Sequence, residues 1–357
     1  MIAPLHSPQT PDQIAQELLR LSPQYAPTPL LDLPKLAARL GVAQVLAKDE
    51  GRRTLGSFKS LGGTYAGLRA LARAASVDIA DLLGAKHPRA LPALICASDG
   101  NHGLAVAAAA KFAGAPARIY LHTGVDAVRA SRIEAQGAEI VWVTGTYDDA
   151  VDAALTAAKA GEGVVVADTT HDPSDLVSAD VLAGYGVLAS EIRQQAEAAC
   201  CAKPTHLFVQ AGCGGLAAAM TLGLKAWLAP PATIVVVEPE KAACVAAALE
   251  QGRVVRIAGD LVTSAEMLSC GEASAPALDV LRQAGATTMT ASDAALAGAT
   301  ALLRECGGPS TTPSGAAGLA GAVLTVATPD RGRDVALDGS SRVLIIVTET
   351  ELDKTEP

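Results

Sequence analysis

Aromatic residues and clusters of basic residues are scarce in this chain. Only 3% of its 357 residues are aromatic, although half are hydrophobic. Small aliphatic side chains must therefore fill the interior, which suits helices packed closely on a parallel sheet. No Lys/Arg-rich run occurs, and 28 basic against 37 acidic residues give a net charge of −9. This balance disfavours binding to nucleic acid or to an anionic membrane.

Targeting signals, membrane spans and metal-ligand spacings are also missing. Residues 1–13 show no basic stretch followed by an apolar core, so no signal peptide is predicted. Every strongly apolar segment contains Gly, Pro or a charge within 18 residues, so no membrane span is predicted. The seven cysteines include no C-x-x-C pair, and the six histidines show no zinc spacing. We therefore expect free thiols, no metal site and a cytoplasmic location.

The middle of the chain alternates short apolar segments with alanine-rich ones, which predicts strand–helix–strand units and a parallel sheet. The length allows two lobes with ample cores, and no linker separates them, so we expect the lobes to interleave. Strands are expected at 45–48, 94–97, 117–121, 139–143, 163–167, 206–210, 233–237 and 342–348. Helices are expected at 33–40, 64–75, 104–113, 126–136, 147–160, 184–195 and 216–227. Residues 28–30 are expected to form a turn.

A lysine-containing stretch, residues 48–65, holds four glycines and leads into an alanine-rich helix. Lys59 lies at the predicted start of that helix, beside Phe58. The positive end of the helix dipole and the apolar ring both lower an amine pKa, which suits a lysine that forms a Schiff base. A lysine taken alone in this position is ordinarily solvated, so the interpretation depends on the other segments.

A glycine-rich turn, Gly212-Cys213-Gly214-Gly215, separates a predicted strand from a predicted helix. Its three glycines allow backbone N–H groups to converge on one anion, with the helix dipole behind them. We therefore predict a phosphate-binding turn. The segment matches neither G-x-x-x-x-G-K-[ST] nor the complete G-x-G-x-x-G pattern, which disfavours P-loop and ordinary dinucleotide sites. Alone, it is equally compatible with a plain tight turn.

A third segment, Ser98 to Gly103, reads S-D-G-N-H-G and also follows a predicted strand. Asn101 can form a hydrogen bond with an oxygen on a bound ring, and Asp99 is a candidate acid or base. Taken alone, the segment favours an ordinary helix cap at Asp99 or Asn101 and a solvated or core-satisfied histidine at His102.

Together these segments resemble the pyridoxal-phosphate enzymes of fold type II, the tryptophan-synthase-β type, in which a lysine, an S-x-G-N-H-G loop and a glycine-rich phosphate loop follow in that order. The resemblance sharpens to the 2,3-diaminopropionate ammonia-lyases. It rests there on Lys48-Asp49-Glu50, Phe58-Lys59, Cys270-Gly271-Glu272 and Thr348-Glu349.

Two segments depart from the pattern of that family. Thr170 to Pro173 replaces an aromatic, W-E-G-Y-like stretch, and the closing N-T-E-G motif reads V-T-E-T at 347–350. The first departure bears on the substrate side of the cleft more than on the cofactor side.

The resemblance implies an α/β fold of type II, with large and small three-layer αβα lobes, mostly parallel twisted sheets and the cofactor, pyridoxal 5'-phosphate, in the cleft between them. Residues 1–75 and 165–357 would form the large, cofactor-binding domain, and residues 76–164 the small domain. Family members are usually homodimers, so a homodimer acting on a small amino acid is expected.

The resemblance also implies a role for each site residue. Lys59 would hold the cofactor and take the Cα proton from one face, and Asp99 would act as base on the opposite face, so that D- and L-isomers both react. Asp168 would orient the β-amino group, Asn101 would contact the ring hydroxyl, and Thr348 would face the pyridine nitrogen. Glu272 is a weaker candidate with a structural role. The expected cofactor-binding set is Lys59, Phe58, Asn101, Gly212, Cys213, Gly214, Gly215, Leu216 and Thr348.

The implied reaction is α,β-elimination of 2,3-diaminopropionate to pyruvate and ammonia. A serine/threonine or 3-hydroxyaspartate dehydratase would share every cofactor residue, so this alternative stays open. A catalytically silent pyridoxal-phosphate-binding protein is the third hypothesis, and the presence of both Lys59 and Asp99 argues against it.

Overall fold

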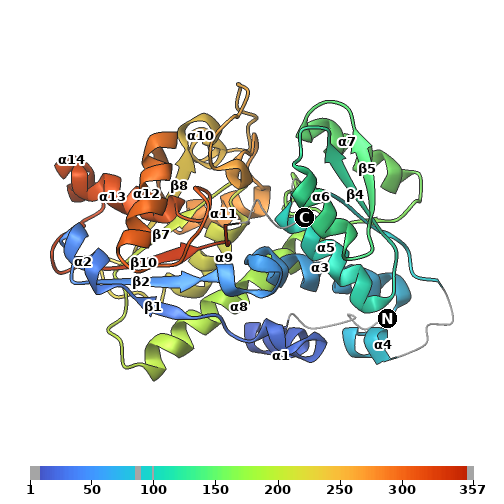
Figure 1. Cartoon of the computed structure of the whole chain (residues 1–357), viewed down its shortest axis with the longest axis horizontal. Helices are drawn as coiled ribbons and strands as arrows, with labels where there is room; N and C mark the ends of the chain where they lie inside the picture. The colour runs from blue at the N-terminus through green and yellow to red at the C-terminus, as the bar shows by residue number, and fades with distance from the viewer. Residues whose placement is uncertain (1–8, 85–89, 99, 352–357) are drawn as a thin grey trace.

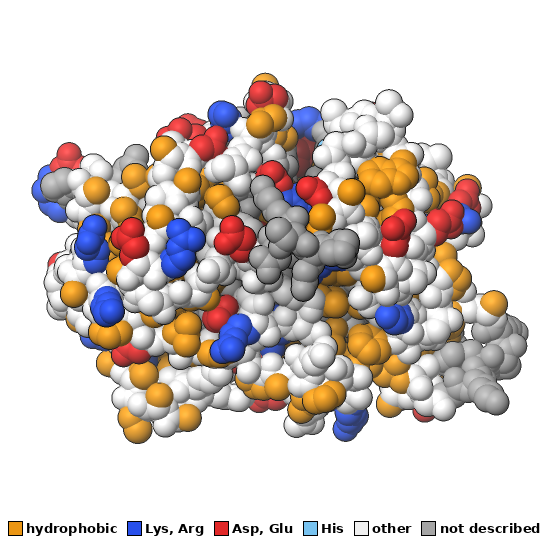
Figure 2. Space-filling view, viewed as in Figure 1, with side chains coloured by type: hydrophobic (Ala, Val, Ile, Leu, Met, Phe, Trp, Pro, Cys, Tyr) orange, Lys and Arg blue, Asp and Glu red, His pale blue; other side chains and the backbone are white. Residues whose placement is uncertain are grey.

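Two sheets, one at the centre of each lobe, form the framework of the molecule (Figure 1). The computed structural model describes residues 9–84, 90–98 and 100–351. Among these residues no helix is long and apolar enough to cross a membrane. Figure 2 shows acidic and basic side chains interspersed over the face in view.

The larger sheet has six strands in the order β1-β2-β10-β7-β8-β9. The first strand is antiparallel to its neighbour, and the other pairs are parallel. The strands are β1 (Leu30–Asp32), β2 (Gln44–Asp49), β7 (His206–Gln210), β8 (Thr233–Pro239), β9 (Thr287–Ala291) and β10 (Arg342–Val347).

The smaller sheet has four parallel strands in the order β5-β4-β3-β6. They are β3 (Leu94–Ala97), β4 (Ala117–His122), β5 (Glu139–Val143) and β6 (Val164–Val165). The parallel arrangement and most of the expected strands are confirmed, since each predicted apolar segment lies in a strand of one of the two sheets.

Helices cover both sheets. Those around the larger sheet are α1 (Pro11–Leu21), α2 (Pro34–Leu40), α8 (Leu176–Ala198), α9 (Gly215–Leu224), α10 (Cys244–Gln251), α11 (Ala275–Gln283), α12 (Asp293–Glu305), α13 (Ala317–Ala327) and α14 (Pro329–Asp334). The remaining helices are α3 (Lys59–Ala75), α4 (Ile79–Gly84), α5 (Asn101–Ala113), α6 (Ala127–Glu134) and α7 (Tyr147–Lys159). Short 3-10 turns are η1 (Pro23–Tyr25), η2 (Glu50–Arg52), η3 (Thr54–Gly56), η4 (Glu240–Ala242) and η5 (Glu266–Leu268).

The larger sheet is buried on both faces, as its uninterrupted apolar strands require. On β10, Leu344 and Ile346 belong to the core cluster that includes side chains of α8 and α9. Val343, Ile345 and Val347 belong to the opposite cluster, with side chains of α12 and α13. The chemistry-bearing segments are therefore held on a rigid, doubly covered sheet.

The crossing of α3 and α8 explains why α8 is longer than the sequence predicts. The expected helix began at residue 184, whereas α8 begins at Leu176. At the crossing, a Cβ added to Gly184 would lie 2.7 Å from the Cα of Gly62, and one added to Gly62 would lie 2.4 Å from Tyr185. The glycines that suggested a helix boundary instead permit two long helices to approach closely.

Two strands of the larger sheet were missed. Residues 28–30 were expected to form a turn, but Leu30–Asp32 pairs with β2 as an antiparallel edge strand. Thr287–Ala291 extends the opposite edge beside β8. Both are edge strands, which need only one partner, and their short sequences carry little periodic signal.

Candidate active site

The candidate site lies where several parallel strands end. Residues 50–59 follow β2, residues 98–101 follow β3, residues 211–215 follow β7, and Thr348 follows β10. Ligands of open α/β proteins bind at this carboxyl edge. The predicted residues that line one cavity here are Phe58, Lys59, Asn101, Asp168, Gly212, Cys213, Gly214, Gly215, Leu216 and Thr348. Asp99, the predicted second base, lies outside the described residues.

The lysine loop is joined to the segment that follows β10. The N–H of Phe58 donates to the carbonyl of Thr348 at 3.1 Å, and the N–H of Thr350 donates to the carbonyl of Gly56 at 3.0 Å. Ser57 and Glu349 form an isolated antiparallel bridge between these bonds. Two segments from opposite ends of the chain therefore meet beside the lysine.

Lys59 is the first residue of α3, as predicted, and its ammonium group is ion-paired with the carboxylate of Asp168. Burial alone would lower the pKa of Lys59, but the charge of Asp168 outweighs it, so the pKa stands well above its usual value. The predicted lowering of this pKa is therefore wrong for this arrangement. The dipole and the Phe58 ring, 5.5 Å from the Nζ atom, do not offset a contacting carboxylate.

Asp168 is held ionised by the same contact. Burial would raise the pKa of its carboxyl, but Lys59 and then His102 lower it below its usual value. In this structure Asp168 thus acts as the counter-ion of Lys59. Its expected contact with a β-amino group stays a prediction.

The glycine-rich turn leads directly into α9, whose first turn has no capping side chain. Gly214 has φ +94°, a left-handed conformation that favours glycine. A Cβ added to Gly212 would lie 2.8 Å from the Sγ of Cys270 and would narrow the turn. The uncapped N–H groups of α9 and the space above the turn fit a bound anion.

Thr348 is held by Gln210, a residue that the sequence interpretation missed. The Nε2 of Gln210 donates to the Oγ1 of Thr348 at 3.1 Å and also lies near the carbonyls of Ser314, Gly315 and Ile346. Because the threonine oxygen accepts here, its own hydrogen is available to an acceptor in the cleft, such as a ring nitrogen.

Asn101 is the first residue of α5, and its amide Nδ2 donates to a carboxylate oxygen of Glu349. The hydroxyl of Thr312 donates to the other oxygen. Burial raises the pKa of Glu349 above its usual value, although both hydrogen bonds act in the opposite direction. Glu349 is only 6% exposed. The contact of Asn101 with a ring hydroxyl stays a prediction.

Comparison with known proteins agrees with this geometry, because the profile of a family described as pyridoxal-phosphate dependent enzymes matches residues 21–349. The chain belongs to the pyridoxal-phosphate-dependent enzyme family. Its cofactor is pyridoxal phosphate, and its fold is the type II fold that was expected.

Diaminopropionate ammonia-lyases resemble this chain over nearly its whole length. The enzyme of Escherichia coli (strain K12) is 32% identical over 365 residues, covering 98% of this chain and 91% of the relative. That of Salmonella typhimurium (strain LT2) is 32% identical over 347 residues, covering 92% and 86%. A crystal structure of the Escherichia coli enzyme, in complex with an aminoacrylate-PLP azomethine reaction intermediate, superimposes with a TM-score of 0.84 at 31% identity, covering 98% and 90%.

The observed residues fit a pyridoxal-phosphate enzyme. The turn at Gly212–Gly215 offers N–H groups to a phosphate, Lys59 offers an amine, and Thr348 offers a neutral hydroxyl. All three line one cavity and come from different elements. The role of each residue toward the cofactor stays a prediction.

His102 lines the same cavity, but its contacts are structural. Its Nε2 lies 2.9 Å from the carbonyl of Val166, and because a carbonyl can only accept, Nε2 carries the hydrogen. Burial lowers the pKa of His102, which keeps the ring neutral. The neutral histidine ties α5 to the segment that precedes Asp168.

Two tyrosines of the cavity were assigned no role from the sequence, although Gly184-Tyr185-Gly186 is one of the segments that resemble the family. The ring of Tyr185, from α8, lies 4.9 Å from that of Phe58, and Tyr147 begins α7. Both positions look like ordinary helical aromatics, so only the fold reveals them as cavity walls. Glu272, the weaker candidate, lies outside the lining and accepts from Arg256 at 3.0 Å, with His171 at 2.8 Å.

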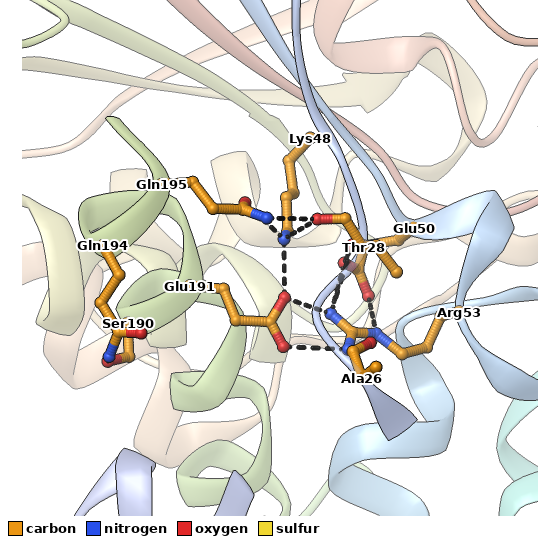
Figure 3. Close-up of polar contacts among 9 residues, drawn as sticks. All are labelled: Ala26, Thr28, Lys48, Glu50, Arg53, Ser190, Glu191, Gln194 and Gln195. Atoms are coloured by element: carbon orange, nitrogen blue, oxygen red, sulfur yellow. Dashed lines mark hydrogen bonds and ion pairs between the residues drawn. The ribbon is translucent and has the colours of Figure 1, made fainter. Parts of the chain in front are cut away.

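A buried charge network supports the lysine loop from below (Figure 3). Glu191 of α8 accepts from Lys48 at 2.6 Å and from both terminal nitrogens of Arg53 at 2.6 and 2.9 Å. Arg53 also pairs with Glu50 at 2.8 Å. Two cations and two carboxylates thus balance one another and fix the loop between β2 and Lys59 to α8.

Proposed function

We propose that this chain is a pyridoxal-phosphate-dependent ammonia-lyase that converts 2,3-diaminopropionate to pyruvate and ammonia. The observation that carries the proposal is the convergence of Lys59, the Gly212–Gly215 turn and Thr348 in one cavity. The near-complete coverage of the chain by diaminopropionate ammonia-lyases supports the choice of substrate.

The cofactor, when bound, withdraws electrons from the substrate Cα and so acidifies its proton. The backbone N–H groups at Gly212–Gly215 hold its phosphate, with Cys213 and Leu216 as neighbours. Phe58 packs beside the ring. Thr348 presents a neutral hydroxyl to the ring nitrogen, which leaves that nitrogen less charged than a carboxylate partner would.

Lys59 would hold the cofactor through its amine, and the same amine, when free, would take the Cα proton from one face. Its ion pair with Asp168 fixes the position of the amine in the cavity. Asp99 is proposed as the base on the opposite face. Two bases on opposite faces would let both isomers of the substrate react.

A division into two domains accompanies the proposal, with residues 1–75 and 165–357 binding the cofactor and residues 76–164 forming the small domain.

We further propose a homodimer located in the cytoplasm. The homodimer is proposed from the resemblance described above, and sedimentation equilibrium tests it. A mass near twice 36.0 kDa is expected, whereas a mass of one chain would exclude a dimer.

A substrate panel tests the proposed reaction against the dehydratase alternative. The purified protein, loaded with pyridoxal phosphate, is assayed for pyruvate from D- and L-2,3-diaminopropionate and from serine, for 2-oxobutyrate from threonine, and for oxaloacetate from 3-hydroxyaspartate. We expect diaminopropionate to give the highest kcat/KM. Faster turnover of a hydroxy amino acid would support the dehydratase, and no turnover of any substrate would support a catalytically silent protein.

A further inference from the structure

We infer that Glu349 is a specificity-determining residue whose carboxylate is the counter-ion of the substrate's β-ammonium group. This inference rests on the proposed function, because it concerns how the same site distinguishes a β-amino from a β-hydroxy substrate. It differs from the expected role of Asp168, whose carboxylate is held by the lysine.

Glu349 stands at the junction of two cavities. It lines the cavity that contains Lys59 and also an outer cavity bounded by Arg129, Arg132 and Thr350. Asn101 lines both cavities as well. Glu349 therefore borders both the cavity that contains Lys59 and the neighbouring cavity.

Glu349 has hydrogen-bond donors but no ion pair among the residues that the structure describes. Its two oxygens accept from Asn101 and Thr312, both of which are neutral. A buried carboxylate without a cation is costly, because neutral donors replace only part of its hydration. Glu349 is 6% exposed, so most of its contact with bulk solvent is lost.

Three cations, Lys59, Arg129 and Arg132, act on this carboxylate through their charge but make their contacts with other groups. Lys59 is paired with Asp168, and Arg129 is paired with Glu266. The Nη2 of Arg132 donates to the carbonyl of Leu55 at 2.8 Å. Within the described part of the chain, Glu349 therefore makes no ion-pair contact, and its carboxylate lines the cavity that contains Lys59.

The substrate supplies such a cation. When the α-amino group of 2,3-diaminopropionate is joined to the cofactor, its β-ammonium group keeps a positive charge, whereas serine offers only a neutral hydroxyl at that position. A carboxylate contact stabilises an ammonium group by a charge-assisted hydrogen bond and does little for a hydroxyl. The charge on Glu349 thus favours diaminopropionate over serine.

The same contact helps the bond to break. The base removes the Cα proton, the Cα–Cβ double bond forms from that electron pair, and the Cβ–N bond breaks with its electron pair going to nitrogen. If the nitrogen is held as –NH3+, it leaves as neutral NH3 and needs no further proton. Glu349 keeps the group in this charged state, so that atoms, electrons and protons balance without a separate acid.

The test compares how much kcat/KM falls for each of two substrates when Glu349 is replaced, in the variant Glu349→Gln. One is 2,3-diaminopropionate, and the other is β-chloroalanine, which loses chloride and carries no β charge. Initial rates of pyruvate release are measured with the cofactor-loaded protein. We expect kcat/KM for diaminopropionate to fall about 100-fold, the size seen when one partner of a buried charge pair is removed, mostly as a rise in KM. For β-chloroalanine we expect a fall of less than about fivefold.

Two matched variants separate the charge effect from general damage. Glu139→Gln removes a carboxylate that is 61% exposed and lines neither cavity, and both substrates are expected to stay within about threefold of the unmodified protein. Asp168→Asn removes the partner of Lys59, and both substrates are expected to fall together. Cofactor content and the circular dichroism spectrum confirm that each variant is folded and loaded.

Parallel loss of both substrates in Glu349→Gln, or no loss with diaminopropionate, would overturn the inference. If the unmodified protein fails to release pyruvate from diaminopropionate but releases it from serine, the proposed function itself fails. These outcomes are distinguishable in one set of assays.

Discussion

Removing the charge of Glu191 should destabilise the protein more than removing any surface carboxylate. Glu191 is 5% exposed and accepts three short hydrogen bonds, one from Lys48 and two from Arg53. In Glu191→Gln, two buried cations face only Glu50. Burial already lowers the pKa of Lys48, and Glu191 is the main charge that restores it. The variant leaves that amine without its counter-ion.

The magnitude follows from the imbalance of charge. Breaking a buried ion pair by removal of one partner costs about 3–5 kcal/mol, because an uncompensated charge is left inside. Glutamine keeps one acceptor oxygen, so the lower end, about 3 kcal/mol, is expected. Adding Lys48→Met leaves Arg53 paired with Glu50, and this double variant should recover at least about 1 kcal/mol of the loss.

Urea unfolding followed by circular dichroism, at one protein concentration, measures these differences. Glu139→Gln is the control, because Glu139 pairs with Arg118 at 2.9 Å on the surface, where the two side chains are 61% and 36% exposed. Its loss should cost less than about 1 kcal/mol. A loss below about 1 kcal/mol for Glu191→Gln, or a double variant less stable than the single one, would refute the charge-balance reasoning.

Three further predictions concern the cavity and the buried acids. Lys59→Ala should lose the visible absorbance band of the attached cofactor and at least about 10³-fold in pyruvate release; an unchanged spectrum after dialysis would exclude Lys59 as the attachment point. Asp99→Asn should lose turnover of D-diaminopropionate while keeping much of the L-isomer rate, and equal loss of both would contradict two bases. Burial raises the pKa of Glu238 from 4.5 to about 7. Its contribution to stability is then complete below pH 4.5 and is lost as the pH rises through 7. Because a shift of one pKa unit corresponds to about 1.4 kcal/mol, the free energy of unfolding of the unmodified protein should fall by about 3 kcal/mol over that pH range, relative to that of Glu238→Gln. Parallel profiles of unfolding free energy against pH for the two proteins would rule this out.

The backbone framework of the site was predictable because local patterns encode it. Lys59, Asn101 and the glycine turn each follow a strand, and parallel strands end at one edge, so their order along the chain implied a common site. Their residue types also suffice to suggest a phosphate, an amine and a ring partner. The cofactor and the role of each residue came from the resemblance of the three segments, taken together, to a known family.

The electrostatics of the site were not predictable from local sequence. The pKa of Lys59 depends on Asp168, which lies 109 positions away and approaches only because β6 pairs beside β3. The helix dipole and Phe58 are local and visible, but their effects are smaller than that of a contacting carboxylate. The surroundings of Glu349 depend in the same way on Asn101, 248 positions away.

The stoichiometry of ammonia and pyruvate tests the proposed elimination most directly. Elimination of the β-amino group followed by hydrolysis consumes one water and releases two ammonia molecules for each pyruvate from 2,3-diaminopropionate. The cofactor-loaded protein is incubated with each isomer, and both products are quantified at several times. We predict a ratio of two throughout, and one in a parallel reaction with serine. A ratio of one from diaminopropionate, or ammonia without pyruvate, would contradict the proposed elimination.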